Sequence, residues 1–196
     1  AISGSFILDN EGKMGEFQMG SLLLLVASSV SLYAAGVILN DVFDFKLDQI
    51  ERPERPIPSG KVSLRSAAIY GAILMLTGIL LAFVANSLSG LLALLLAGSI
   101  LLYDALAKPH GFFGPLNMGV CRGLNLLLGI SILGALPNWW FAFVPIISIA
   151  AITLISRGEV HGNNKKHIIF AGVLYTFVIF SVLGLMLGSE RTLVWM

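Results

Sequence analysis

Charged residues are scarce in this chain. Only 12% of its 196 residues are charged, 57% are apolar, and the mean hydropathy is +0.90. A soluble domain averages about 25% charged and about 45–50% apolar residues. The single cysteine, Cys121, excludes a disulfide within these residues. The net charge is only +1 and there is no basic stripe, so we expect no nucleic-acid partner. The composition therefore indicates a membrane protein.

Long uncharged stretches predict the number of membrane crossings. Residues 66–103, 123–156 and 168–189 contain no Asp, Glu, Lys or Arg. A spanning helix needs about 20 residues at about 1.5 Å each, so the first two stretches are long enough for two crossings apiece. Turn signals at Asn86-Ser87 and Pro137-Asn138 divide them. The predicted fold is an all-α polytopic membrane helix bundle with crossings at 20–40, 66–86, 89–105, 115–136, 139–156 and 167–188.

The basic residues test this topology independently. With six crossings, the segments 41–65, 106–122 and 157–166 fall on one side of the membrane. Ten of the twelve Lys and Arg residues lie in these three segments. Because basic residues are enriched in cytoplasmic loops, the sequence predicts an integral membrane protein with its charged loops on the cytoplasmic side.

A cluster of oxygen-bearing side chains follows the first predicted crossing. Asn40, Asp41, Asp44 and Asp48 come directly after the uncharged residues 21–39. If the helix continues, the four-residue steps between 40, 44 and 48 place those side chains on one face. Like charges this close repel, so a cation is expected beside them. Oxygen ligands with room for phosphate oxygens suit Mg²⁺, which predicts a divalent-metal and diphosphate site at the membrane surface.

Basic side chains on the same side are candidate partners of a diphosphate. Arg52 and Arg55 alternate with prolines, which end the helix and stiffen the turn, and arginine grips phosphate with two parallel hydrogen bonds. Lys108 is either a further counter-charge or a side chain that extends to the membrane surface. Arg122 lies in an apolar segment, where it is expected to face a cavity or to pair with Asp104 or helix carbonyls.

Amide and acidic side chains extend this pattern. Asn117 and Asn125 lie in the same apolar segment as Arg122. Glu159 and Asn163 are four residues apart, so one helical turn would present two more oxygens on the side of the first cluster. The alternative interpretation of this last segment is a polar loop without a binding role.

The run NDVFDFKLD followed by RPERPIPSG closely resembles the first aspartate-rich motif of the UbiA superfamily of intramembrane prenyltransferases. The segments GPLNMGVCRGLNLLLG and SRGEVHG look most similar to its EboC-like branch. The resemblance implies a bundle of nine crossings around a central cavity. We therefore expect residues 1–196 to form a single prenyltransferase-like membrane domain, with about six of these crossings and with helices missing at both ends.

In this family, two aspartate-rich motifs hold Mg²⁺ ions that bridge the prenyl diphosphate. The resemblance implies a first motif of Asn40, Asp41, Asp44 and Asp48. The second motif commonly reads DxxDxEGD, and the aligned stretch here runs from Ser156 to Asn163 with Glu159 between them. Ser156 and Asn163 each lack a carboxylate, so weaker metal binding, a one-metal site and loss of catalysis all stay open.

The resemblance implies Mg²⁺-dependent transfer of a prenyl (alkyl or aryl, not methyl) group from a polyprenyl diphosphate to an aromatic or hydroxyl acceptor in the bilayer. Aromatic rings would face the allylic carbocation, and the candidates are Phe43, Tyr103, Phe112 and Phe113, although each is more often simple packing. The expected metal ligands are Asn40, Asp41, Asp44, Asp48, Glu159 and Asn163; the expected catalytic groups are Asp44, Asp48, Lys108 and Arg122; and the expected substrate-binding groups are Asn40, Arg52, Arg55, Tyr103, Lys108, Asn117, Arg122 and Asn125.

Two other functions compete with this one. A non-catalytic relative that binds a prenyl lipid or supports its transport is favoured by the altered second motif. An ion or solute transporter is disfavoured, because transporters usually keep their binding carboxylates near the bilayer midplane and these lie at one rim.

Overall fold

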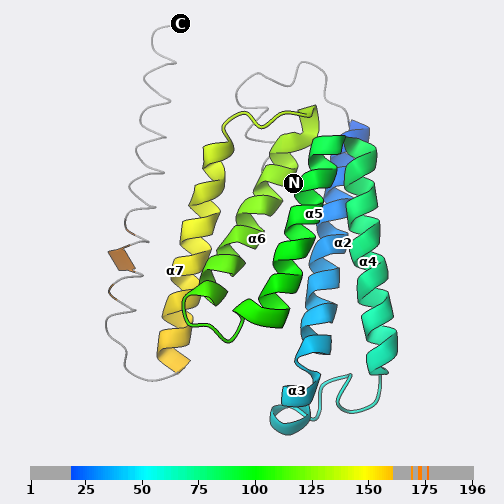
Figure 1. Cartoon of the computed structure of the whole chain (residues 1–196), viewed down its shortest axis with the longest axis vertical. Helices are drawn as coiled ribbons and strands as arrows, with labels where there is room; N and C mark the ends of the chain where they lie inside the picture. The colour runs from blue at the N-terminus through cyan, green and yellow to red at the C-terminus, as the bar shows by residue number, and fades with distance from the viewer. Residues whose placement is uncertain (1–18, 161–168, 170–171, 174–175, 177–196) are drawn as a thin grey trace, which may run out of the picture. The chain divides into compact units, whose positions relative to one another are not determined.

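The computed structural model of this chain describes residues 19–160, 169, 172, 173 and 176 (Figure 1). These residues contain no β-strand. Five helical segments are long and apolar enough to cross a membrane: 19–43, 64–85, 87–107, 113–133 and 139–156. They confirm the all-α membrane fold and match the first five predicted crossings to within a few residues. Most of the sixth predicted crossing, 167–188, lies outside the described residues.

The elements in chain order are α2 (Met19–Phe43), α3 (Phe45–Glu51), α4 (Leu64–Ala85), α5 (Ser87–Leu102), the π-helical turn η1 (Tyr103–Ala107), α6 (Phe113–Ile130), the 3₁₀ turns η2 (Ser131–Leu133) and η3 (Trp139–Ala142), and α7 (Phe143–Val160). They form two compact units. The first contains the described residues up to 107 together with 124–139, and the second contains 108–123 and the described residues from 140 onward.

In the first unit, α2, α4 and α5 pack side by side (Figure 1). The buried positions of α2 are 25, 28, 32, 35 and 39, and those of α4 are 67, 71, 75, 78 and 82. Steps of three and four place each set on one helix face. Gly71 and Gly78 let the two backbones approach closely, because a Cβ at Gly78 would lie 2.7 Å from Leu32. Ser28 Oγ donates a 2.6 Å hydrogen bond to the Gly78 carbonyl oxygen.

The turn between α4 and α5 lies at Asn86, where the sequence predicted it. The Asn86 Oδ1 accepts a 2.8 Å hydrogen bond from the backbone N–H of Ser89 and so caps α5. Its Nδ2 donates a 2.9 Å hydrogen bond to the carbonyl oxygen of Ser131, which begins η2. One side chain therefore starts a helix and ties it to a segment 45 residues away.

Asn86→Ala should lower the free energy of unfolding by about 1–2 kcal/mol, because it removes both the cap and the bond to Ser131. Denaturant unfolding in detergent micelles would measure this change. Asn86→Asp keeps the capping oxygen but not the donor, so it should lose less. An unchanged midpoint for Asn86→Ala would contradict the assignment.

In the second unit, α6 and α7 approach each other through glycine. A Cβ at Gly119 would lie 2.3 Å from the backbone oxygen of Ile146, and one at Gly123 would lie 2.5 Å from the Ile146 side chain. Real Cβ atoms essentially never come this close to backbone atoms, so only glycine fits at position 119. Small residues at helix contacts are a recurring device for packing in membranes, where lipid gives helices little hydrophobic reason to associate.

Candidate active site

The first aspartate-rich segment lies where α2 ends and α3 begins. The backbone N–H groups of Asp44, Asp48 and Arg52 donate 2.9 Å hydrogen bonds to the carbonyl oxygens four residues earlier. Residues 40–52 are therefore mostly helical, but the helix is interrupted at Asp44, whereas the four-residue spacing had predicted one continuous helix. Asp44, the residue between the two helices, has φ −78° and ψ −5°.

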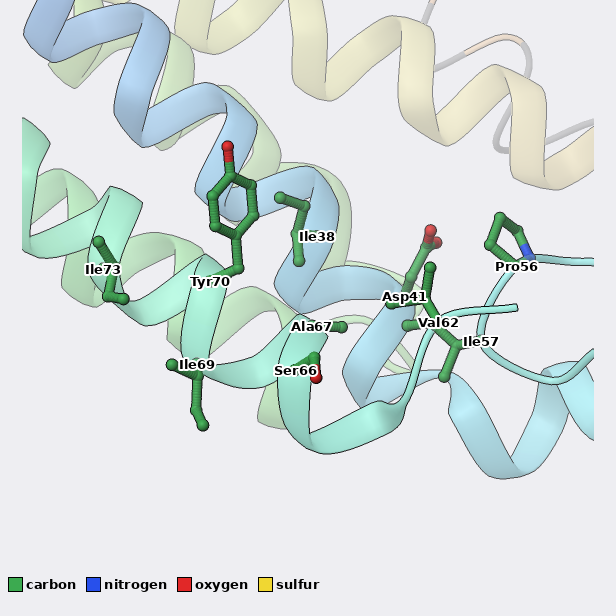
Figure 2. Close-up of a pocket in the computed structure, with 10 residues that line it drawn as sticks. All are labelled: Ile38, Asp41, Pro56, Ile57, Val62, Ser66, Ala67, Ile69, Tyr70 and Ile73. Atoms are coloured by element: carbon green, nitrogen blue, oxygen red, sulfur yellow. The ribbon is translucent and has the colours of Figure 1, made fainter. Parts of the chain in front are cut away.

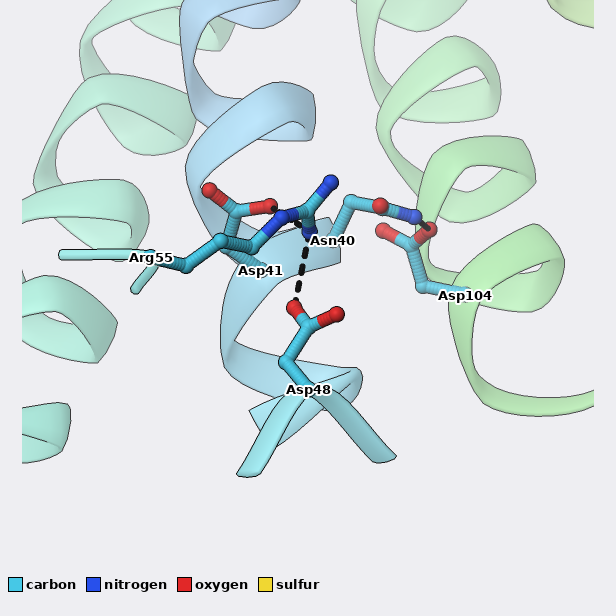
Figure 3. Close-up of polar contacts among 5 residues, drawn as sticks. All are labelled: Asn40, Asp41, Asp48, Arg55 and Asp104. Carbon is cyan, nitrogen blue, oxygen red and sulfur yellow. Dashed lines mark hydrogen bonds and ion pairs between the residues drawn. The ribbon is translucent and has the colours of Figure 1, made fainter. Parts of the chain in front are cut away.

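Arg55 joins two of the carboxylates in this segment (Figure 3). Its Nη1 lies 2.7 Å from Asp48 Oδ2 and 3.1 Å from Asp41 Oδ1. Asp48 is only 4% exposed, so its charge depends on this partner. The hydrogen bond that Arg55 donates to Asp48 raises the pKa of Arg55 above its ordinary value, against the opposing effect of burial, and the charges of Asp48, Asp41 and Asp44 add to the rise. The cation expected beside the acidic cluster is, in this structure, supplied by the chain itself.

The loop after α3 folds back so that Arg55 reaches α2. The N–H of Ser59 donates to the Arg55 carbonyl oxygen at 2.9 Å, and the N–H of Val62 donates to the Pro56 carbonyl oxygen at 3.1 Å. Gly60 has φ +76°, a left-handed conformation that glycine adopts without strain. The apolar Ile57 side chain is buried beneath the loop. The proline-rich segment is thus a folded turn, and it fixes the position of Arg55.

A second polar contact joins α2 to η1. Asn40 Nδ2 donates a 2.9 Å hydrogen bond to Asp104 Oδ1, across 64 residues of sequence (Figure 3). Asp104 lies in the π-helical turn, a rare conformation that is frequent at functional sites. The sequence indicates Asp104 only as a possible partner of Arg122. Its position is nevertheless a signal, since it is the first charge after 38 uncharged residues, on the same predicted side as the acidic cluster.

A mainly apolar groove of about 630 Å³ adjoins this cluster (Figure 2). Asp41 and the loop residues lie at one end, and Ile73 lies at the other. The groove falls within the range of about 300–1,000 Å³ that is usual for small-molecule sites. Its lining residues are Ile38, Asp41, Pro56, Ile57, Val62, Ser66, Ala67, Ile69, Tyr70 and Ile73.

The sequence of this chain matches the model of a known protein family. The model of the UbiA prenyltransferase family matches residues 12–196. The chain belongs to the UbiA prenyltransferase family. The resemblance inferred from the acidic motif is therefore confirmed, whereas its similarity to the EboC-like branch stays a prediction.

Several curated UbiA-family relatives are digeranylgeranylglyceryl phosphate synthases. The chain is 40% identical over 111 residues to that of Methanococcoides burtonii, which covers 57% of the chain and 40% of the relative. It is 34% identical over 163 residues to that of Thermococcus gammatolerans, which covers 82% of the chain and 59% of the relative. The chain thus spans about two-fifths to three-fifths of the length of these relatives.

A solved structure supports the same fold. It is described as giving insights into digeranylgeranylglyceryl phosphate synthase in membranes. The match has a TM-score of 0.75 at 26% identity and covers 95% of this chain and 71% of that one. The bundle of this UbiA-family member is therefore that of a known membrane prenyltransferase.

The donor set at the end of α2 fits the Mg²⁺ ions that the family implies. Asn40, Asp41, Asp44 and Asp48 offer only oxygen as ligand atoms, and hard cations such as Mg²⁺ prefer oxygen. Arg55 engages one oxygen each of Asp41 and Asp48. Among the side chains that the structure describes, no three His, Cys, Asp or Glu residues come together as a metal site.

The other predicted site residues fall in three groups. Tyr103, half-buried, precedes Asp104 in η1, and Arg52 is exposed after α3. Lys108, Asn117 and Arg122 belong to the second unit, where Asn117 is buried and Arg122 is exposed. Glu159 lies in the last turn of α7, without a described side chain, and Asn163 lies outside the described residues.

Asn125 lies far from the acidic cluster. Its Oδ1 accepts a 2.7 Å hydrogen bond from Ser29 Oγ on α2. Ser29 precedes Asn40 by eleven residues, or about 16 Å along the helix at about 1.5 Å per residue. Asn125 therefore ties α6 to the middle of α2, and any contact it makes with a substrate would be with the part remote from the diphosphate.

Proposed function

We propose that the full-length protein transfers a prenyl group from a polyprenyl diphosphate to a hydroxyl acceptor in the membrane, with Mg²⁺ bound at the cytoplasmic end of α2. The single observation that carries the proposal is the arrangement at this end. Asp41 and Asp48 share Arg55, and Asn40 is held by Asp104, all in a chain of the UbiA family. Acidic oxygens and a cation at a membrane rim suit a diphosphate head group joined to an apolar chain.

The relatives support the choice of a hydroxyl acceptor over an aromatic one. Digeranylgeranylglyceryl phosphate, the product in their names, carries two geranylgeranyl groups on glycerol phosphate. Its formation joins a second prenyl carbon to a glycerol hydroxyl oxygen. The donor proposed here is accordingly geranylgeranyl diphosphate, and the acceptor is a glyceryl phosphate that already carries one prenyl chain.

In the reaction, the bond between the first prenyl carbon and a diphosphate oxygen breaks. A bond forms from that carbon to the acceptor oxygen, and the hydroxyl proton leaves. Mg²⁺ held by Asn40, Asp41, Asp44 and Asp48, with Glu159 and Asn163, would supply positive charge to the leaving diphosphate. Lys108, Arg122 and Arg52 are the proposed further counter-charges, since cations already in place lower the barrier as negative charge develops. Tyr103 is the proposed aromatic neighbour of the carbocation.

Arg55 has a more specific part in this proposal than the sequence suggested. Because its guanidinium binds Asp41 and Asp48, its first task is to hold these carboxylates and the loop in place. Asp41 and Asp48 are likewise proposed to anchor Arg55 as well as to bind metal. Asn40 and Asp44 complete the proposed metal-binding side chains of the first motif.

The second candidate function is a non-catalytic protein that binds a prenyl lipid or assists its transport. The observation that favours it is the second motif, in which Ser156 and Asn163 stand where acidic residues are usual. Such a protein would bind the diphosphate without releasing a product.

The test uses full-length protein in nanodiscs with geranylgeranyl diphosphate, Mg²⁺ and either geranylgeranylglyceryl phosphate or a phenolic acceptor. Mass spectrometry should detect digeranylgeranylglyceryl phosphate and no prenylated phenol. Prenylation of the phenol alone would overturn the acceptor class. Diphosphate binding without any product would favour the non-catalytic function.

A further inference from the structure

The contact between Asn40 and Asp104 joins the first aspartate-rich segment to the turn η1. Asn40 belongs to the first aspartate-rich segment, whereas Asp104 lies outside both motifs. Asp104 belongs to η1, the π-helical turn that directly follows α5. The hydrogen bond between them is 2.9 Å long and part-buried. An acidic side chain from another helix therefore touches a predicted metal ligand.

The chemistry of the pair fixes the orientation of the Asn40 amide. An ionised carboxylate only accepts hydrogen bonds, so the NH₂ end of Asn40 must face Asp104. The amide oxygen, bonded to the same carbon, then points away from Asp104. Figure 3 shows the Asn40 nitrogen turned toward an Asp104 oxygen, to which it is joined by the dashed line. Without Asp104, the amide could rotate and present its NH₂ group instead.

We infer that Asp104 is a positioning residue of the active site, because it turns the Asn40 amide so that its oxygen faces the metal and diphosphate. This inference rests on the proposed function. A metal ligand is commonly held by a partner outside the coordination sphere, and removing that partner typically costs about 10–100-fold in metal affinity or activity. Asp104 acts here through Asn40 and need not touch the metal itself.

The alternative role is a simple tie between α2 and η1. A tie of this kind stabilises the fold and leaves metal affinity unchanged. The chain offers a matched control, since Asn86 Nδ2 also donates a 2.9 Å part-buried hydrogen bond to a distant segment. Asn86 lies at the other end of α5 from η1, so its loss should affect stability alone.

The experiment titrates Mn²⁺, an oxygen-binding substitute for Mg²⁺, into full-length protein in nanodiscs and measures free Mn²⁺ by electron paramagnetic resonance. Asp104→Ala should raise the Kd for Mn²⁺ by about 10-fold or more. Asp104→Asn keeps an oxygen that can accept from Asn40, so its Kd should lie between those of wild type and Asp104→Ala. Asn86→Ala should keep the wild-type Kd. If Asp104→Ala does not fold, the comparison of Asp104→Asn with wild type decides between a positioning role and a simple tie.

Equal Kd values for wild type and the Asp104 variants would overturn the inference, even if their melting temperatures fell. That result would leave the proposed function intact if the wild-type protein still forms the prenylated product. Wild-type protein that binds Mn²⁺ but forms no product would refute the proposed prenyl transfer. The ratio of the Kd values of the Asp104 variants and wild type would still decide the role of Asp104. Wild-type protein that binds no Mn²⁺ would overturn both the metal assignment and the inference.

Discussion

Arg55→Ala should lower the free energy of unfolding by about 2 kcal/mol and reduce prenyl transfer by about 100-fold. The variant leaves the buried Asp48 without its cation and frees the loop from α2. Removing one partner of a fully buried pair costs about 3–5 kcal/mol, and an exposed pair contributes about 0–1 kcal/mol. The side chain of Arg55 is 30% exposed and that of Asp48 is 6% exposed, so the expected loss lies between these limits. Unfolding in detergent and product formation would measure the two effects.

Arg52→Ala is the matched control for this prediction. Arg52 lies in the same loop, is exposed, and makes no side-chain hydrogen bond or ion pair with the described residues. Its replacement should change stability by less than about 0.5 kcal/mol. Equal stability losses in the two variants would show that loop charge in general, and not the bridge between Asp41 and Asp48, holds the segment.

Gly119→Val should destabilise the protein by about 3 kcal/mol and abolish most of its activity. The new side chain would collide with the backbone oxygen of Ile146. This oxygen belongs to the backbone of a helix, so a change of side-chain rotamer cannot move it aside. Overpacking typically costs about 1–3 kcal/mol, and a clash with backbone belongs at the upper end of this range. The helices α6 and α7 would have to separate. Since α7 carries Glu159 in its last turn, the second motif would move with it.

Gly98→Ala provides the comparison for Gly119→Val. Gly98 lies inside α5, and a Cβ there would meet nothing within 4 Å in the described part of the chain. Alanine should therefore be neutral or should stabilise the helix by up to about 1 kcal/mol. A stable, active Gly119→Val protein would show that the close approach of α6 to α7 is not required.

Much of the fold follows from hydropathy and a few turn residues. Uncharged stretches of about 20 residues must cross the membrane as helices, so their number and rough bounds can be counted. Asn86 was identifiable as a turn because its side chain caps a helix locally. The four-residue spacing of Asn40, Asp44 and Asp48 predicted one continuous helix, but the structure divides this segment into α2 and α3 at Asp44.

The contacts that organise the site could not be predicted in the same way. The sequence assigned Arg55 to a diphosphate, yet its guanidinium is held by Asp41 and Asp48, because the direction of the loop after α3 depends on tertiary packing. The partner of Asn40 lies 64 residues away, and the π-helical turn that presents it has no sequence signature in this chain. Asn125 shares its segment with Arg122, but only the pairing with Ser29 shows that it lies beside the middle of α2.

Metal-dependent prenyl transfer at the end of α2 can be tested by comparing pyrophosphate release by wild-type protein and Asp44→Asn, with and without Mg²⁺. Asparagine is isosteric with aspartate, and an unchanged melting temperature would show that the half-buried position 44 tolerates the amide. We expect release that requires Mg²⁺ and falls by about 100-fold or more in the variant, which corresponds to losing about 3 kcal/mol of transition-state stabilisation. Release that proceeds without Mg²⁺, or that Asp44→Asn leaves unchanged, would contradict a metal-dependent prenyl transfer at the end of α2.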